Sequence, residues 1–167
     1  MAEQLTKSDI KKIQAEIDDR ILVQRPKLIA DLKEARAQGD LSENFEYYAA
    51  KRAKNQNESR IRYLENMLKN AIEVDDTTTD GVVSLNDTVT FYIPEDDFEE
   101  TVKIVTSIRG NSLRGKISNE SPVGKALLGH KVGDTCTVEV PGGENYEIQI
   151  TALDQSSNDE DDTIRKF

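Results

Sequence analysis

Two carboxylates, Asp40 and Glu43, stand three residues apart in the polar run of residues 38–44 (QGDLSEN). Magnesium prefers hard oxygen ligands and is often held by only one or two carboxylates, so this pair could supply half of a site to a partner that supplies the rest. The same spacing fits a capping box, in which side chains satisfy backbone amides at a helix start, with Asp40 or Ser42 as the cap. The spacing alone leaves both interpretations open.

A basic segment follows the two carboxylates. Residues 51–62 (KRAKNQNESRIR) hold five basic side chains against one acidic one, a net charge of +4 that begins with Lys51 and Arg52. This segment is either a solvated helix face or a strip that contacts phosphates. Tyr47 and Tyr48, just before it, either stack on an unpaired base or pack the end of a helical hairpin.

Composition limits the other chemistry that this chain can perform. Its 167 residues carry 22 basic and 32 acidic side chains, for a net charge of -10. With one cysteine, Cys136, and one histidine, His130, the chain has neither an internal disulfide nor enough soft ligands for a structural zinc site. The sequence shows no run of about 20 apolar residues and no apolar stretch at its start. We therefore expect a cytoplasmic protein, and any metal chemistry must use carboxylates.

The charge is divided unevenly along the chain. Residues 1–74 carry 14 basic and 13 acidic side chains, whereas residues 75–167 carry 8 and 19, so almost all of the negative charge lies in the second part. Such an acidic surface argues against broad binding to exposed duplex nucleic acid, because phosphates must be neutralised by basic side chains. Residues 76–81 are short and polar and end in Gly81, as expected of a linker between two domains.

The first domain, residues 1–75, is predicted to be an antiparallel hairpin of two helices. Its apolar side chains recur at intervals of three and four residues, which predicts one helix over residues 8–38 and a second from Phe45 onward. Pro26 lies inside the first helix and should kink it near Leu22. The stripes consist of Ile10, Ile13, Ile17, Ile21, Leu28 and Leu32 on the first helix and Ile61, Leu64, Leu68 and Ala71 on the second.

The second domain, residues 82–154, is predicted to contain an antiparallel sheet and one short helix, which makes the chain an α+β protein. Five runs rich in β-branched residues predict strands over residues 88–93, 101–108, 113–118, 135–140 and 146–153. Ser121 and Pro122 are typical of a helix cap and the first helical position. Residues 155–167 are acidic and poor in apolar side chains, so we expect a disordered tail.

Two separated motifs resemble one known family. Residues 39–51 (GDLSENFEYYAAK) closely resemble the tip signature of the bacterial GreA/GreB transcript cleavage factors, and QRPKL and EAR upstream fit the same pattern. Residues 115–134 (GKISNESPVGKALLGHKVGD) and then VEVPGGENYEIQI resemble their C-terminal domain. The resemblance covers residues 6–153 and is closer to GreA. Phe45 and Tyr48 depart from the smaller or more polar residues that are common in GreA-like tips.

The resemblance implies a coiled-coil arm that enters the secondary channel of RNA polymerase and an FKBP-like domain that docks on the polymerase outside it. The factor would be no enzyme itself; it would stimulate the polymerase's own cleavage of backtracked RNA. By motif position, Asp40 and Glu43 would be the catalytic tip residues and would share magnesium with the polymerase, without binding it tightly alone. Lys51 and Arg52 would contact the RNA 3′ segment or the channel wall.

The resemblance also places Glu120, Ser121 and Pro122 at the polymerase-docking surface, although helix initiation alone explains the same three residues. The resemblance also implies DNA binding, and we expect a monomer with no membrane partner. Two other functions fit parts of the sequence. One is a secondary-channel regulator or inhibitor that does not support cleavage, suggested by the aromatic residues at the tip; the other is an FKBP-like folding helper, which the lack of Trp disfavours.

Overall fold

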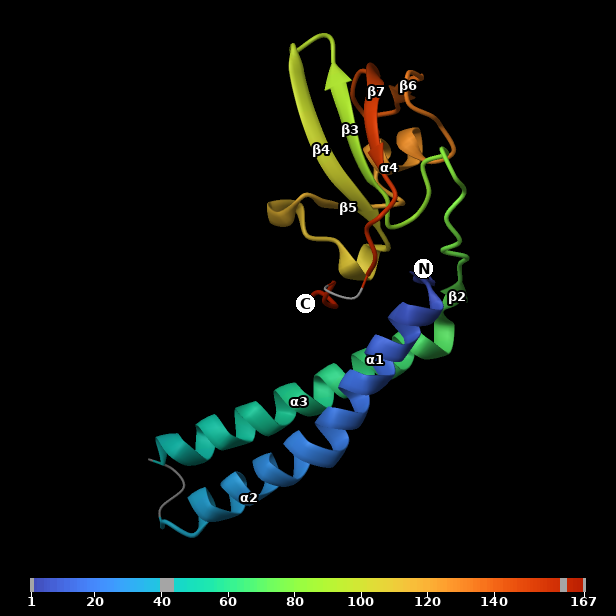
Figure 1. Cartoon of the computed structure of the whole chain (residues 1–167). Coiled ribbons are helices and arrows are strands. Elements are labelled where there is room, and N and C mark those ends of the chain that lie inside the picture. Colours follow the sequence, from blue (N-terminus) through green and yellow to red (C-terminus); the bar gives the residue numbers. More distant parts are fainter. Residues whose placement is uncertain (1, 40–43, 160–161, 167) are drawn as a thin grey trace. The chain divides into compact units, whose positions relative to one another are not determined.

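The computed structural model describes residues 2–39, 44–159 and 162–166 (Figure 1). The chain forms two compact units: residues 9–71 build the first, and residues 3–8 join the chain from residue 72 onward to build the second. The boundary therefore falls between Ala71 and Ile72, before the predicted linker. Within the described residues, no helix is both long enough and apolar enough to cross a membrane.

The first unit is a helical hairpin, as its apolar stripes predict. One arm consists of α1 (Lys7–Asp19), the π-helical segment η1 (Arg20–Gln24) and α2 (Arg25–Arg36), and the other arm is α3 (Phe45–Asn70). The two arms run side by side in opposite directions (Figure 1). Its buried apolar side chains are Ile13, Ile17, Leu32 and Ala35 on the first arm and Ile61, Leu64 and Met67 on the second.

The first arm changes its helical winding where the sequence predicts a kink. Pro26 lies at the start of α2 and has no backbone N–H, so the regular hydrogen-bond ladder cannot continue through it. The chain responds with one wider turn, in which the Arg25 N–H donates to the Arg20 carbonyl oxygen five residues back. Such π turns are a known source of helix bending. Leu22 and Val23 on this turn are 73% and 62% exposed.

Charged side chains link the two arms beside the π turn. The Arg60 side chain, 6% exposed, donates from Nε to Glu16 Oε2 at 2.9 Å, and Arg20 Nε donates to the same oxygen at 2.8 Å. Burial alone would raise the Glu16 pKa, but these two guanidinium groups outweigh it and lower the pKa. Arg25 holds Glu58 through two hydrogen bonds, at 2.7 and 2.9 Å. These pairs fix the register of the arms.

A five-stranded sheet forms the core of the second unit, with the strands in the order β5-β4-β3-β7-β6. The strands are β3 (Thr88–Ile93), β4 (Phe98–Val105), β5 (Lys116–Ser118), β6 (Thr135–Val138) and β7 (Tyr146–Asp154). Two 3-10 turns, η2 (Ser107–Arg109) and η3 (Ser112–Arg114), connect β4 to β5. The sheet is not wholly antiparallel as predicted, because β5 pairs with β4 in parallel.

One face of this sheet carries the core. Alternate residues of the strands point to this face, which α4 (Pro122–Leu127) covers with Ala126 and Leu127. Cys136 is buried here as a small core side chain. The buried strand residues are Val89, Phe91, Val102, Ile104, Cys136, Val138, Ile148 and Ile150. The opposite face bears threonines and charged side chains, as in other one-sided sheets.

The N-terminus contributes to the second unit, which the sequence did not predict. The strand β1 (Gln4–Leu5) pairs in parallel with β2 (Ile72–Glu73). Leu5 is fully buried. The Asn119 side chain also donates to Gln4 Oε1 at 3.0 Å. Residues 3–8 therefore belong to the second unit and not to the hairpin domain assigned to residues 1–75.

The prediction of a disordered tail over residues 155–167 is wrong for the part of it that the structure describes. Gln155 donates to the Val82 carbonyl oxygen at 3.0 Å and to Asp87 Oδ2 at 2.9 Å. Asp162 is 4% exposed. Its carboxylate lies 2.6 Å from Lys116 Nζ and 2.7 Å from Arg109 Nη1. An acidic segment is expected to be disordered when its carboxylates have no basic partners. Here Arg109 and Lys116, in another part of the fold, pair with Asp162 and hold the segment in place.

Candidate functional site

The hairpin end is organised by Asn44, the residue that precedes α3. Its side-chain oxygen accepts the Tyr47 N–H at 3.0 Å, which makes Asn44 the N-cap of α3. Its side-chain nitrogen donates to the Ala35 carbonyl oxygen on α2 at 2.7 Å. One amide thus caps the second arm and ties it to the last turn of the first. On the α2 side, Gly39 takes a φ of 111°, a conformation that a residue with a side chain rarely adopts.

Asp40 and Glu43, the predicted tip carboxylates, lie outside the described residues. The described helix start nevertheless bears on the alternative role assigned to them. Because α3 begins at Phe45 with Asn44 as its cap, neither Asp40 nor Ser42 is the N-cap of this helix. The prediction that one of them caps it is wrong: Asp40, Ser42 and Asn44 are all residue types that can cap a helix, and the last of the three is the cap.

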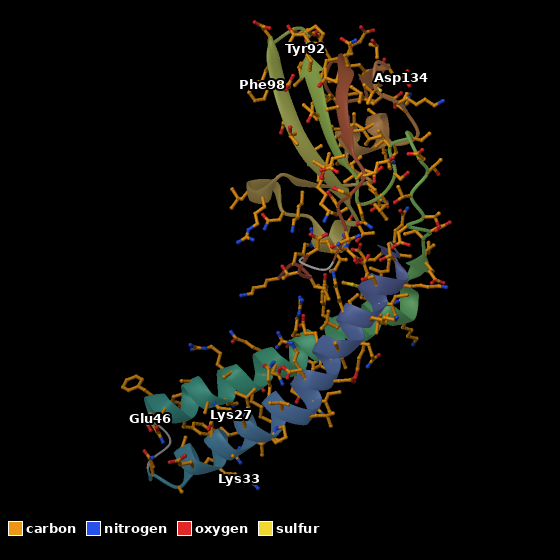
Figure 2. The ribbon with its side chains drawn as sticks, in the orientation of Figure 1. Lys27, Lys33, Glu46, Tyr92, Phe98 and Asp134 are labelled. Atoms are coloured by element: carbon orange, nitrogen blue, oxygen red, sulfur yellow. The ribbon has the colours of Figure 1, made fainter. Side chains whose placement is uncertain are left out.

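The chemistry of Asp40 and Glu43 suits a shared divalent cation. They are two hard oxygen donors on a short connection, and Asn44 performs the capping of α3. Elsewhere at the hairpin end, Asp31, Glu34 and Glu46 line a depression of about 240 Å³, and Figure 2 shows Glu46 at the first turn of α3. No three metal-binding side chains within the described residues are placed to hold a metal ion.

The aromatic residues near the tip divide into packed and exposed ones. Tyr47 is half-buried: its ring lies 5.8 Å from the Arg36 guanidinium carbon, and the Tyr48 ring meets it edge-on at 5.4 Å. These contacts support the packing interpretation for Tyr47. Phe45, in contrast, is 86% exposed, and Tyr48 is 46% exposed. Phe45 is thus the large apolar side chain that the first turn of α3 presents to solvent.

The basic segment of α3 is only partly available to a ligand. Lys51 and Arg52 are exposed and form no ion pair with any described residue. Arg60 is instead buried against Glu16, as described above. The net charge of +4 over residues 51–62 therefore overstates the positive charge that is exposed to a ligand. The sequence pattern cannot show which of these basic side chains faces the other arm of the hairpin.

The predicted docking residues form a tight turn before α4. Ser121 Oγ accepts the Gly124 N–H at 3.1 Å, as expected of a helix cap, and Pro122 occupies the first helical position. The Glu120 N–H donates to Ser118 Oγ at 3.0 Å. Its carboxylate accepts from Ser107 Oγ, also at 3.0 Å. Glu120 and Pro122 are exposed, so the turn is both rigid and accessible.

Gly124 is required by this turn. A Cβ atom added to it would lie 2.2 Å from the Ser118 carbonyl oxygen and 3.2 Å from the Asn119 Cα, both of which are backbone atoms. The turn therefore closes against a bare backbone. The sequence analysis did not predict this role. One signal was present, because glycine has a low helix propensity and is unusual two residues after the proline that starts a capped helix.

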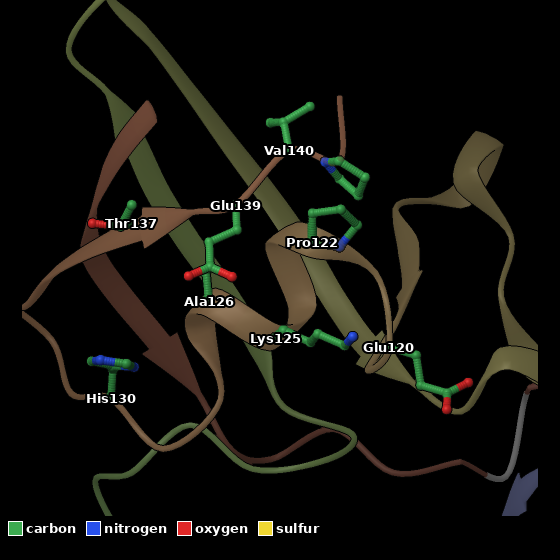
Figure 3. Close-up of a pocket in the computed structure, with 9 residues that line it drawn as sticks. Glu120, Pro122, Lys125, Ala126, His130, Thr137, Glu139 and Val140 are labelled. Carbon is green, nitrogen blue, oxygen red and sulfur yellow. The ribbon is translucent and has the colours of Figure 1, made fainter. Parts of the chain in front are cut away.

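A pocket of about 570 Å³ opens beside the same turn. Figure 3 shows Glu120 and Pro122 on one side of it, Thr137 and Glu139 on β6 and the segment after it, and His130 in the loop that follows α4. The sequence analysis assigned no role to His130 in a pocket and did not single out Glu139. No sequence pattern unites these residues, because the pocket forms only when β6 packs beside α4.

Comparisons with known proteins agree for both units. The family model "Transcription elongation factor, N-terminal" matches residues 3–72, and "Transcription elongation factor, GreA/GreB, C-term" matches residues 78–155. The chain is 46% identical to the transcription elongation factor GreA of Geobacillus kaustophilus over 150 residues, which covers 89% of this chain and 94% of that protein. It is 40% identical to GreA of Staphylococcus aureus (strain JH9) over 149 residues, with the same coverage.

A solved structure is also similar, that of GreA factor homolog 1 from Thermus thermophilus. The two share 28% sequence identity and a TM-score of 0.43, over 92% of this chain and 99% of that one. The two family matches together span most of the chain. The N-terminal match covers the helical hairpin, and the C-terminal match covers the five-stranded sheet. This protein belongs to the GreA/GreB family of transcription elongation factors.

Proposed function

We propose that this elongation factor acts inside RNA polymerase, where its hairpin enters the secondary channel and stimulates cleavage of backtracked RNA. The polymerase would perform the hydrolysis, and this chain would supply two carboxylates to it in the cytoplasm, as a monomer. The observation that carries the proposal is the double hydrogen bonding of Asn44, which fastens both helix ends around the short connection that contains Asp40 and Glu43.

The chemistry requires a metal ion held between the two proteins. Magnesium, when bound, would lower the pKa of the attacking water and stabilise charge on the phosphate, as in other two-metal sites. Asp40 and Glu43 would provide oxygen ligands and orient the water by accepting its hydrogen bonds. Since two carboxylates bind magnesium weakly without further ligands, we expect no tight binding by this chain alone.

Lys51 and Arg52 would position the substrate. Both are exposed, and they lie within the first two turns of α3, close in sequence to the cap at Asn44. Long basic side chains contact phosphate oxygens without reading base identity, so these residues would hold the RNA 3′ segment or the channel wall. Such contacts release counterions, so this contribution should weaken as the salt concentration rises.

Glu120, Ser121 and Pro122 would form part of the polymerase-docking surface. The hydrogen bonds of Ser121 and Glu120 hold this turn in one conformation, and the neighbouring pocket offers a concave surface next to it. A preorganised turn loses little conformational entropy on binding, which favours affinity.

The test uses backtracked transcription complexes with purified polymerase and magnesium. Asp40→Asn combined with Glu43→Gln should abolish stimulated cleavage while the protein still folds and binds polymerase. Asp31→Asn with Glu34→Gln is the matched control, because it removes two acidic charges from the same hairpin end without touching the tip connection. Unchanged cleavage in the tip variant would refute the role of the two carboxylates. Slowed synthesis with intact RNA would instead favour the inhibitor.

A further inference from the structure

A positively charged groove crosses the second unit between the η2–β5 segment and the described end of the tail. It encloses about 790 Å³, and five basic side chains line it: Arg109, Arg114, Lys116, Arg165 and Lys166. No acidic side chain is among its described lining residues. The groove adjoins β5, the strand at one edge of the sheet, whereas the pocket beside Glu120 adjoins β6, the strand at the other edge. The groove and the pocket share no lining residue.

The concentration of charge in this groove contrasts with the rest of its unit. Residues 75–167 contain only eight basic residues against nineteen acidic ones. Five of the eight line the groove, and a sixth, Lys103, lies beside it through its ion pair with Asp162. A cluster of one sign in a concave surface focuses the electrostatic potential and attracts ligands of the opposite sign.

Behind the lining of the groove, two of its basic residues already hold a carboxylate of the tail. Asp162 lies 2.7 Å from Arg109, 2.6 Å from Lys116 and 3.0 Å from Lys103, so three positive charges surround one negative charge. The tail continues past η2, where the Arg165 N–H donates to the Ile108 carbonyl oxygen at 2.8 Å. A segment of this chain thus shows the kind of ligand that the basic side chains accept: a peptide anchored by its acidic side chain.

The outer part of the groove remains available. Arg114 and Lys166 are exposed and form no ion pair with a described residue. Beside Arg114, the Leu113 side chain is 97% exposed. We propose that this groove binds a short acidic peptide segment of a partner protein, whose carboxylates meet Arg114 and Lys166 and whose apolar side chain covers Leu113.

Two features favour an acidic peptide over nucleic acid. The groove is lined by no aromatic side chain in its described part, whereas binding of single strands usually depends on bases stacking on aromatic rings. A nucleic acid would also extend beyond the groove across a surface dominated by carboxylates, which repel phosphates. A short acidic segment fits within the focused patch and can use Leu113, which a phosphate backbone cannot.

This inference does not depend on transcript cleavage. The family matches end at residue 155, and residues 163–166, which form one wall of the groove, lie beyond them. The groove is therefore built partly from a segment outside the matched family domains. Its ligand can be sought with the isolated full-length protein, so failure of this proposal and failure of the cleavage proposal are separate results.

The experiment measures fluorescence anisotropy of a labelled peptide composed of Asp, Glu, Leu and Gly, titrated with the full-length chain at low salt. Arg114→Glu combined with Lys166→Glu should weaken binding at least tenfold. The matched control is Lys69→Glu combined with Lys131→Glu, which makes the same change in net charge at exposed positions outside the groove and should weaken binding far less. Circular dichroism and thermal unfolding verify that both variants fold.

Leu113→Ser extends the test to the apolar contact, and it should weaken binding of this peptide but not of a peptide in which Gly replaces Leu. The proposal is overturned if the wild-type protein fails to bind the acidic peptide, or if both double variants weaken binding equally. It is also overturned if a DNA strand of equal charge binds more tightly than the peptide and loses its affinity in the Arg114→Glu, Lys166→Glu variant.

Discussion

The side chain of Asn44 donates to the carbonyl oxygen of Ala35 at 2.7 Å, from the start of one helix to the last turn of the other. The same side chain caps α3 by accepting the Tyr47 N–H. The two helix ends around the tip connection are therefore held at a fixed separation by one amide group, which can satisfy both partners because it is a donor and an acceptor at once.

Replacing Asn44 by Ala should therefore affect both stability and function. The loss of the cap and of the link to Ala35 should lower the free energy of unfolding by about 1–2 kcal/mol, measured by urea denaturation. Stimulated cleavage should fall further than polymerase affinity does, because the tip carboxylates lose their support. Asn44→Asp is the informative control: it keeps the cap acceptor and loses the donor. If Asn44→Asp cleaves as well as wild type, the link to Ala35 has no functional role.

The pair Arg60 and Glu16 should couple strongly. Arg60 is nearly buried, and removing Glu16 takes away the carboxylate that accepts from its Nε. A double-mutant cycle with Arg60→Ala and Glu16→Ala should therefore give a coupling of about 1–3 kcal/mol. The exposed pair Lys27 and Asp31, with side chains 75% and 46% exposed, serves as the control. Its coupling should be below about 0.5 kcal/mol. Equal coupling for the two pairs would contradict the assignment of Arg60 to the interior of the hairpin.

Asp162 should give the second unit an acid-sensitive contribution to stability. Burial alone would raise its pKa, but hydrogen bonds from Lys116, Lys103 and Arg109 outweigh it and lower the pKa to about 2. Because the folded-state pKa lies below the unfolded value of about 3.9, the stabilisation is fully present above pH 4 and is lost as the pH falls toward 2. At neutral pH it amounts to about 2–3 kcal/mol.

The measurement is the difference in unfolding free energy between wild type and Asp162→Asn as a function of pH. The difference should be large and constant from pH 5 to 7 and should shrink as the pH falls below 4. Using the difference removes the contribution of Asp87, whose pKa is raised by burial and whose effect on stability has the opposite sign. A difference that stays constant down to pH 2 would show that the Asp162 carboxylate is not bonded to these cations.

Gly124→Ala should distort the turn that carries the predicted docking residues. The added Cβ would lie 2.2 Å from a backbone oxygen, which cannot move away as a flexible side chain can, so the cost should be about 1–3 kcal/mol. Polymerase binding should weaken, whereas the hairpin should keep its helicity. Ser121→Ala removes only the cap and should have a smaller effect in the same direction. Unchanged polymerase affinity in both variants would place the docking surface elsewhere.

The sequence predicts the regular elements well because each one is amphipathic or capped. Ile13, Ile17 and Leu32 are buried at the intervals that indicate a helix, and the strands of the larger sheet follow alternating residues. Ser121 and Pro122 begin α4 as their types predict, because cap and first-turn preferences arise from local backbone chemistry that tertiary structure seldom overrides.

The features that were missed depend on contacts between distant residues. Asp162 lies in a segment whose composition indicates disorder, and its ion pairs with Lys103, Arg109 and Lys116, all more than forty residues earlier, help to hold it in place. The strands β1 and β2 have two residues each, too few for any periodicity to reveal them. For the candidate site, the helix start could be located, but the choice of Asn44 over Asp40 as the cap depends on the reach to Ala35, which is a tertiary contact.

The assembly of the second unit from two separate stretches of chain restricts how the protein can be dissected. A fragment cut within residues 76–81 would leave behind both strands of the parallel pair, together with the side chain of Gln4 that Asn119 contacts. The cloning boundary suggested by the linker is therefore the wrong one for producing this unit alone. A single polypeptide in which residues 3–8 are retained, for example by fusing them through a designed connector to residue 72, would preserve the complete unit.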